Sequence, residues 1–140
     1  MTEVVVSGLI VRNRSVLILR RSLNRPGFPG EWEPVSGKLR RGETPWAGVR
    51  REIAEEAGLD ARVNSQPINA TWCKKGAGYR LMLSFAAHAP SGRVHLSREH
   101  VAFRWLDFEQ IEESPGAEGV RESLRRLVAL WPVLRRKAER

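Results

Sequence analysis

Four glutamates are concentrated between residues 37 and 59, in the segment GKLRRGETPWAGVRREIAEEAGL. Glu43 stands alone, whereas Glu52, Glu55 and Glu56 follow one another at steps of three and one. On a helix of ~3.6 residues per turn, these last three carboxylates share one face, where like charges repel. Oxygen ligands gathered in this way suit a hard divalent cation, so the spacing predicts a site for Mg²⁺, with Mn²⁺ as an alternative. The competing interpretation is an acidic helix face that only meets solvent.

The residues around these glutamates predict the helix that positions them. Thr44 is a good N-cap, Pro45 suits the first helical position, and Gly58 is a typical residue just after a helix end. Apolar residues recur at steps of three and four and predict the buried stripe: Trp46, Val49, Ile53 and Ala57. We expect the acidic face to lie roughly opposite this stripe, in solvent or in a cleft.

The same segment resembles the signature of the Nudix hydrolase family. The matching positions are Gly37, Glu43, Arg51-Glu52-Ile53, Glu55-Glu56 and Gly58-Leu59. Members of this family cleave nucleoside diphosphates that are linked to another group. The resemblance implies an α/β fold, an α/β/α sandwich around a mixed β-sheet, formed by a single MutT-like domain over residues 1–140.

The resemblance also implies roles for individual residues. Glu52, Glu55 and Glu56 match the metal-binding glutamates of the family's helix, and the backbone carbonyl of Ser36 would be a further ligand. Arg51 would take part in catalysis by pairing with a glutamate and fixing its conformation. Glu43 would hold the loop against the start of the helix.

A second segment, residues 96–106, has the sequence LSREHVAFRWL. It resembles a loop and strand of the bacterial dihydroneopterin-triphosphate and deoxynucleoside-triphosphate pyrophosphohydrolases. This implies that Glu99 is a metal ligand or the general base. Glu52 is the other candidate for the base. The alternative for Glu99 is a surface glutamate in a polar loop with no role in catalysis. His100 is either a loop-packing histidine or a contact to the substrate or to a metal ligand.

Candidate substrate contacts come from outside the glutamate segment. Arg21, with Arg20 as the alternative, closes a strand at which related enzymes place an arginine on the substrate, and Lys38 could lie near the phosphates. Trp32 could stack on a base, as could Phe28, Trp72 and Tyr79, although large aromatic residues are more often part of the core. One departure from the family pattern is Arg40, at a position where relatives commonly carry an acid.

The remaining chain predicts a mixed α/β order. Apolar runs at 4–11 and 16–20 predict a hairpin in a sheet covered on both faces, and 22–31 is a loop rich in Pro and Gly. Further predictions are an extended piece at 32–35, a second hairpin of strands 61–73 and 79–89, a strand at 101–106, a short helix at 107–113, a helix at 117–131 and a frayed tail from 134. The hairpins exclude an all-parallel sheet.

The composition limits the classes of protein to which the chain can belong. The chain has 140 residues, of which 41% are hydrophobic, as expected for one globular domain. Its single cysteine excludes an internal disulfide and a multi-cysteine zinc site. The apolar run near the start is too short to span a membrane and no basic segment precedes it, so we expect no membrane partner and a cytoplasmic protein.

Three functions fit these observations. The first is a Mg²⁺-dependent pyrophosphohydrolase that directs water at a diphosphate bond of a nucleoside triphosphate or a related small nucleotide. The second is removal of diphosphate from RNA 5′ ends, which the net charge of +8 permits. The third is a catalytically silent nucleotide-binding module, but such modules usually lose the glutamates that this chain keeps. Either a monomer or a homodimer is compatible with the sequence.

Overall fold

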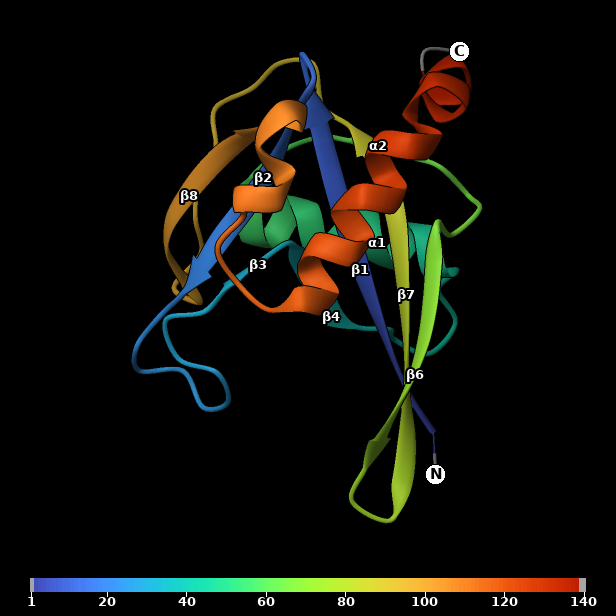
Figure 1. Ribbon diagram of the computed structural model, residues 1–140. Helices are drawn as coiled ribbons and strands as arrows, with labels where there is room; N and C mark the ends of the chain where they lie inside the picture. Colours follow the sequence, from blue (N-terminus) through green and yellow to red (C-terminus); the bar gives the residue numbers. More distant parts are fainter. Residues whose placement is uncertain (1, 139–140) are drawn as a thin grey trace.

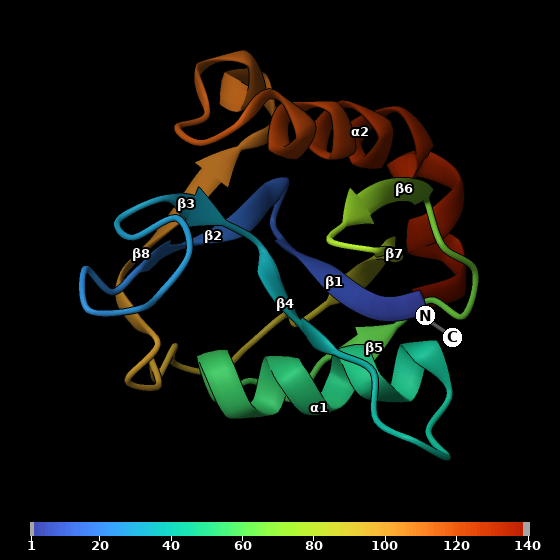
Figure 2. The same ribbon diagram turned by 90° about the horizontal axis from the view of Figure 1, so that it is seen from below.

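A mixed β-sheet with one helix on each face forms the body of the molecule, in a computed structural model that describes residues 2–138 (Figure 1). The strands are β1 (Thr2–Arg12), β2 (Ser15–Arg21), β3 (Trp32–Glu33), β4 (Val35–Lys38), β5 (Arg62–Val63), β6 (Asn69–Lys75), β7 (Gly78–His88) and β8 (His100–Asp107). Helix α1 (Pro45–Ala57) and helix α2 (Glu118–Ala138) cover opposite faces (Figure 2), and a short 3-10 helix spans Phe108–Glu113. The predicted α/β/α arrangement is confirmed.

Strand β1 is central to the sheet, because it pairs with β2, β4 and β7. Near its end it pairs with β2, with Val11 opposite Val16, and near its start it pairs with β4, with Val6 opposite Gly37. Its other edge runs parallel to β7, while the remaining strand pairs are antiparallel. The strands β2 and β4 pair with different parts of the same edge of β1. As a result β4 passes next to α1, whereas β2 continues and pairs with β8.

Each face of the sheet carries its own core. On the α1 side, Val49 and Ile53 pack on residues of β1, β2 and β7 such as Val6 and Phe85. On the α2 side, the core is built from both helix and sheet residues: Leu9, Val11, Ile18, Leu106, Leu124, Leu127 and Trp131. The sheet is therefore covered on both faces, as the continuous apolar runs predicted.

Helix α1 begins and ends as predicted, but its buried face is different. The Thr44 hydroxyl accepts the Ala47 N–H at 3.2 Å, and Gly58 closes the helix with φ +67°. Trp46 was predicted to be buried and is 41% exposed, because the first turn packs through Gly48 on the preceding loop.

The placement of the acidic face opposite the apolar stripe is also wrong. Glu56 is only 3% exposed and lies within the face that packs on the sheet, and the Glu52 side chain is nearly as buried. The reason is the close approach of β4, whose backbone supplies polar groups to this face of the helix.

Two other boundaries differ from the sequence prediction. The predicted strand 61–73 is split into β5 and β6, which both pair with β7, and Pro67 lies in the break, where it cannot donate a ladder hydrogen bond. Helix α2 continues through Pro132 to residue 138 rather than ending at 131, because Trp131 and Leu134 both still contact the core. Residues 139–140 of the predicted frayed tail lie outside the described residues. Across the described chain, α1 and α2 are too short or too polar to cross a membrane.

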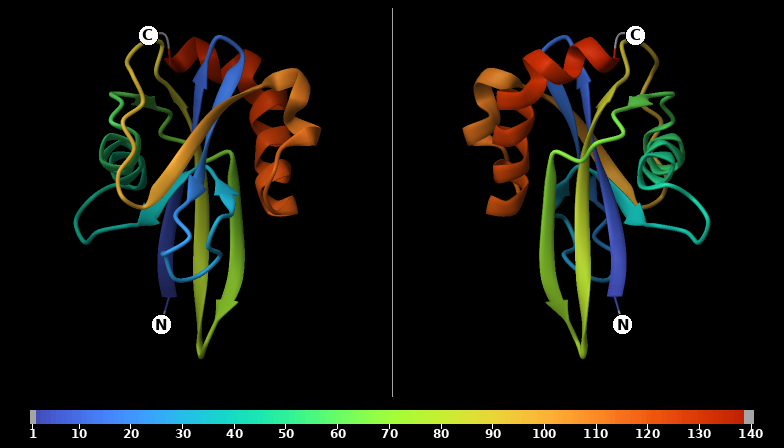
Figure 3. Two further views of the ribbon diagram at one scale, coloured as in Figure 1. Left: turned by 90° about the vertical axis from the view of Figure 1, so that its left-hand side faces the viewer. Right: turned by 90° about the vertical axis from the view of Figure 1, so that its right-hand side faces the viewer.

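The β6–β7 hairpin extends beyond the two helices at the end of the molecule where β1 begins (Figure 3). Its turn is short, with Lys75 paired to Gly78, so the predicted turn at 74–78 is reduced to its central residues. Glu3 of β1 holds this hairpin, because its carboxylate accepts from Lys75 at 2.9 Å and from Arg80 at 2.8 Å.

Candidate functional site

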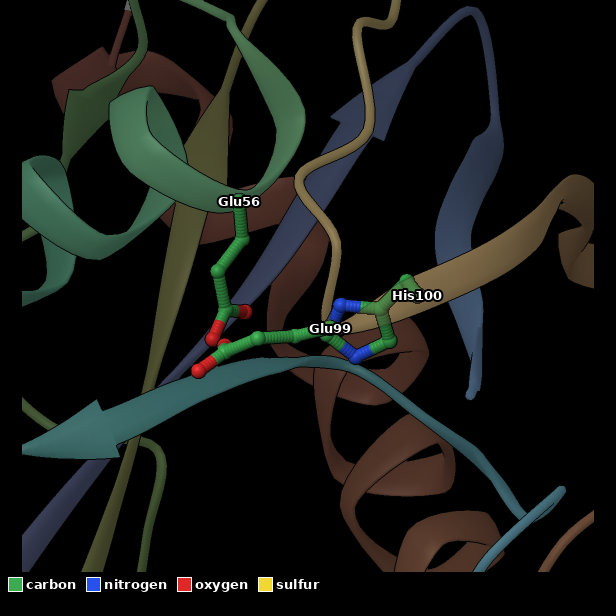
Figure 4. Close-up of side chains that lie close together, drawn as sticks. All are labelled: Glu56, Glu99 and His100. Atoms are coloured by element: carbon green, nitrogen blue, oxygen red, sulfur yellow. The ribbon is translucent and has the colours of Figure 1, made fainter. Parts of the chain in front are cut away.

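Glu56, Glu99 and His100 meet between the last turn of α1 and the start of β8. One ligand atom from each residue lies within 4.8 Å of the others, and Figure 4 shows the two carboxylates meeting beside the imidazole ring. Glu56 is buried, whereas the Glu99 side chain is 50% exposed. The cluster is therefore open to solvent on the Glu99 side and closed on the helix side.

Backbone hydrogen bonds explain how these distant segments meet. The His95 N–H donates to the Ala57 carbonyl at 2.8 Å, and the Ser97 N–H donates to the Glu56 carbonyl at 3.3 Å. These bonds satisfy carbonyls at the end of α1, which have no partner within the helix. The loop before β8 is thus fixed to the helix end, and Glu99 is brought over Glu56.

The electrostatics of Glu56 favour a bound proton or a cation. Burial raises the pKa of Glu56 to about 9, and the neighbouring carboxylates of Glu52 and Glu99, the latter hydrogen-bonded to it, act in the same direction. The Ser36 N–H donates to Glu56 Oε2 at 3.3 Å and opposes the shift. Oxygen donors that repel one another when ionised are a suitable donor set for a divalent cation, so the residues present fit the metal that the sequence predicted.

Glu52 lies directly under the backbone of β4. A Cβ atom at Gly37 would overlap the Glu52 carboxylate, so only glycine lets the strand pass this close. Burial, together with Glu55 and Glu99, raises the pKa of Glu52 above its usual range, and the hydrogen bond from Arg51 limits that shift. Gly37 and Glu52 therefore form one structural unit.

Arg51 is the centre of a network that orients the acids. Its Nε and Nη2 atoms donate to both oxygens of Glu43 at 3.0 and 2.6 Å, and Nη1 donates to Glu52 at 2.6 Å and to Glu55 at 3.3 Å. Nη2 also donates to the carbonyl of Lys38 at 3.2 Å, which ties the helix to β4. Arg51 holds the pKa of Glu43 at about 2.

Three of the predicted metal ligands lie outside the Glu56–Glu99–His100 cluster: Glu52, described above, Glu55 and Ser36. Glu55 is at the surface, where its half-exposed side chain pairs with Arg40 at 3.4 Å as well as with Arg51. Arg40, the departure from the family pattern, thus partly neutralises an acid at the rim of the site. For Ser36, the backbone N–H faces Glu56, as described above.

Sequence reasoning missed Glu33 and Arg25. The Glu33 carboxylate accepts from Arg21 Nη1 at 3.1 Å and lies 2.9 Å from His100 Nε2. Arg25 lies 3.6 Å from Glu33 and 3.7 Å from Glu99, so it joins the 22–31 loop to the cluster. Although burial favours the neutral acid, His100 and Arg21 hold the pKa of Glu33 below its usual range. A charged residue within the short extended segment WEPV was the available signal.

The predicted substrate contacts are dispersed. Arg21 is mostly buried against Glu33, Trp32 is half-buried and packs against the α2-side core, and the His100 ring is fully buried. Lys38 pairs with Glu3 at 3.0 Å. Because side chains alternate along a strand and position 37 faces α1, the side chain of Lys38 lies on the opposite face of β4 from the acids.

Comparison with known protein families gives one clear match. The family model described as the NUDIX domain matches residues 1–127. The chain is 31% identical over 122 residues to the "Putative 8-oxo-dGTP diphosphatase 2" of Mycobacterium tuberculosis, which covers 81% of this chain and 79% of that protein. It is 32% identical over 112 residues to a "MutT-like protein" of Streptomyces ambofaciens, with coverage of 79% and 68%.

A longer relative and a solved structure are also similar to this chain. The chain is 32% identical over 132 residues to an octanoyltransferase of Myxococcus xanthus but spans only 36% of that protein's length. The crystal structure of the MutT protein from Methanosarcina mazei Go1 superposes with a TM-score of 0.78 at 25% identity, covering 89% of this chain and 91% of that one. Since the domain model, the relatives and the fold coincide on the segment that holds the clustered acids, this chain belongs to the Nudix hydrolase family and is a MutT-like member of it.

Proposed function

We propose that this chain, acting as a single domain over residues 1–140, is a divalent-metal-dependent pyrophosphohydrolase of a nucleoside triphosphate or a related nucleotide. The observation that carries the proposal is the meeting of buried Glu56 with Glu99 next to the Arg51 network. A catalytically silent module would have no need to keep mutually repelling carboxylates in a partly buried position.

The proposed metal ligands are Glu56 and Glu99, with Glu52, Glu55 and the Ser36 carbonyl completing the set. A bound Mg²⁺ or Mn²⁺ would neutralise phosphate charge and make water a better nucleophile. Arg51 would act as a positioning residue, because its bonds to Glu43 and Lys38 fix the guanidinium that holds Glu52.

Glu99 is the proposed general base. Its side chain is half exposed and reaches solvent, whereas the Glu52 carboxylate is enclosed by β4 and bonded to Arg51. A base must reach the proton that it removes, and the exposed acid meets that requirement with no rearrangement. Glu52 is the alternative base.

A nucleoside triphosphate is the proposed substrate class. The supporting observations are the similarity to the "Putative 8-oxo-dGTP diphosphatase 2" and the net charge of +8, which favours a polyanion. The candidate substrate contacts are Arg21, Trp32, Lys38 and His100. Because the His100 ring is buried, it would act on the substrate through its neighbours. The finer resemblance of residues 97–106 to dihydroneopterin-triphosphate enzymes stays a prediction.

A substrate panel tests this function. The protein is incubated with Mg²⁺ or Mn²⁺ and with 8-oxo-dGTP, the four deoxynucleoside triphosphates, dihydroneopterin triphosphate and 5′-triphosphorylated RNA, and release of pyrophosphate and phosphate is scored. We expect pyrophosphate from at least one small triphosphate, abolition by chelator, and at least a hundredfold slower release by Glu56→Gln, the size expected when a metal ligand is lost. The matched control is Glu122→Gln on α2, which should hydrolyse at the wild-type rate.

Two outcomes would change the conclusion. Release from RNA alone would assign the enzyme to RNA 5′ ends. No release from any substrate by a folded, metal-loaded protein would overturn the proposed function in favour of a binding module.

A further inference from the structure

His100 has one ring nitrogen bound and one left without a partner. Its side chain is 0% exposed, Nε2 lies 2.9 Å from the Glu33 carboxylate, and Nδ1 is buried with no hydrogen-bond partner among the described residues. An unpaired buried nitrogen costs about 1–3 kcal/mol. A protein that only needed to fill this space could have used an apolar side chain.

The contact with Glu33 settles which nitrogen carries the proton in the neutral ring. An ionised carboxylate can only accept, so Nε2 must donate, and the lone pair is then on Nδ1. Glu33 is kept ionised and in place by Arg21 at 3.1 Å and by Arg25 at 3.6 Å. The tautomer is therefore imposed by a partner whose own position is fixed.

A ring nitrogen of His100 belongs to the group of ligand atoms described above, and Nδ1 is the nitrogen that Glu33 leaves free. The ligand atoms offered by His100, Glu56 and Glu99 all lie within 4.8 Å of one another, and Figure 4 shows the nitrogen-bearing edge of the ring turned towards the two carboxylates. Histidines that bind metals typically donate their other ring N–H to a carboxylate, which orients the ring and strengthens it as a ligand. Glu33, His100 and the carboxylate pair reproduce that arrangement.

We propose that His100 Nδ1 is a nitrogen ligand of a divalent cation held jointly with Glu56 and Glu99, and that this donor makes the site prefer Mn²⁺, Co²⁺ or Zn²⁺ over Mg²⁺. The inference rests on the proposed metal site and adds a ligand to it. Imidazole binds transition metals well, whereas Mg²⁺ favours oxygen donors. Glu33 and Arg21 then act as positioning residues for the ligand.

Pulsed electron paramagnetic resonance of the Mn²⁺-loaded, full-length protein tests the proposal directly. We expect modulation from a directly bound ¹⁴N nucleus, replaced by the ¹⁵N pattern when the protein carries ¹⁵N-labelled histidine. The chain has three histidines, so the assignment is simple. The signal should disappear in His100→Gln and persist in the matched control His95→Gln.

Metal affinities provide the second measurement. By titration calorimetry, His100→Gln should lower the affinity for Mn²⁺, Co²⁺ and Zn²⁺ by about tenfold or more and change that for Mg²⁺ by less than about threefold. Glu33→Gln should weaken the transition metals by about 10–100-fold in the same selective way.

The outcomes separate this inference from the proposed function. Wild-type protein that binds Mn²⁺ without nitrogen coupling overturns the inference, even if the enzyme releases pyrophosphate. Nitrogen coupling in a protein that hydrolyses no nucleotide supports the inference and overturns the function instead. If His100→Gln does not fold, the comparison of ¹⁴N- and ¹⁵N-histidine wild-type protein still decides.

Discussion

The backbone of Gly37 on β4 lies against the carboxylate of Glu52 on α1, with no room for a Cβ atom between them. The same carboxylate is bonded to Arg51 at 2.6 Å, and Arg51 is bonded in turn to the carbonyl of Lys38, the residue after Gly37. The glycine, the glutamate and the arginine of the motif are therefore one packed assembly, in which each fixes the position of the others.

Gly37→Ala should damage both stability and activity. The added methyl group must push Glu52 or β4 aside, which costs about 1–3 kcal/mol as overpacking does elsewhere. We expect the free energy of unfolding in urea to fall by that amount and kcat to fall at least tenfold. Gly119→Ala is the control, because nothing lies within 4 Å of its added Cβ. A Gly37→Ala protein of wild-type stability would show that β4 can move away without cost.

Arg51→Lys should separate positioning from substrate binding. Lysine keeps the charge but cannot reproduce the bidentate pair with Glu43 together with the bond to Glu52. We expect kcat to fall roughly tenfold or more, KM for the nucleotide to change less than threefold, and stability to fall by about 1–2 kcal/mol. A rise in KM at constant kcat would instead place Arg51 on the substrate.

Glu56 should give the metal-free protein a characteristic pH dependence. Its folded pKa of about 9 lies above the usual 4.5, so the folded state holds a proton that the unfolded chain releases. The stability that this proton contributes is fully present below pH 4.5 and is lost as the pH rises to about 9, at up to ~1.4 kcal/mol per pH unit.

The measurement is the unfolding free energy of wild type minus that of Glu56→Gln, determined with chelator between pH 5 and pH 9. We expect this difference to fall steadily across the range, since glutamine cannot titrate. Saturating Mg²⁺ should reduce the slope, because a cation replaces the proton. A difference that does not vary with pH would show that Glu56 titrates normally.

What the sequence could and could not predict follows from the range of the interactions. The caps of α1 and the β1–β2 hairpin depend on neighbouring residues, and Thr44, Pro45 and Gly58 were sufficient to predict the helix. Trp46 was misplaced because apolar spacing does not reveal that Gly48 provides the contact of the first turn.

The functional site, like the fold, could be predicted only where neighbouring residues determine it. The motif predicted which acids matter, but the separation of Glu55 from Glu56 depends on Arg40 and on the approach of β4. Glu33 could not be paired with His100 from the sequence, because the two residues are 67 positions apart and meet only through the β2–β3 and β2–β8 pairings.

Replacing the two candidate bases separately should identify the residue that takes the proton from water. Glu99→Gln removes the exposed carboxylate and should lower kcat by at least about 10²-fold at saturating metal, as expected for loss of a general base. Glu52→Gln should lower kcat less, since Arg51 would still orient the amide. If Glu99→Gln loses less than tenfold while Glu52→Gln loses at least about 10²-fold, the base is Glu52, and the enclosed carboxylate under Gly37 must open to water during turnover.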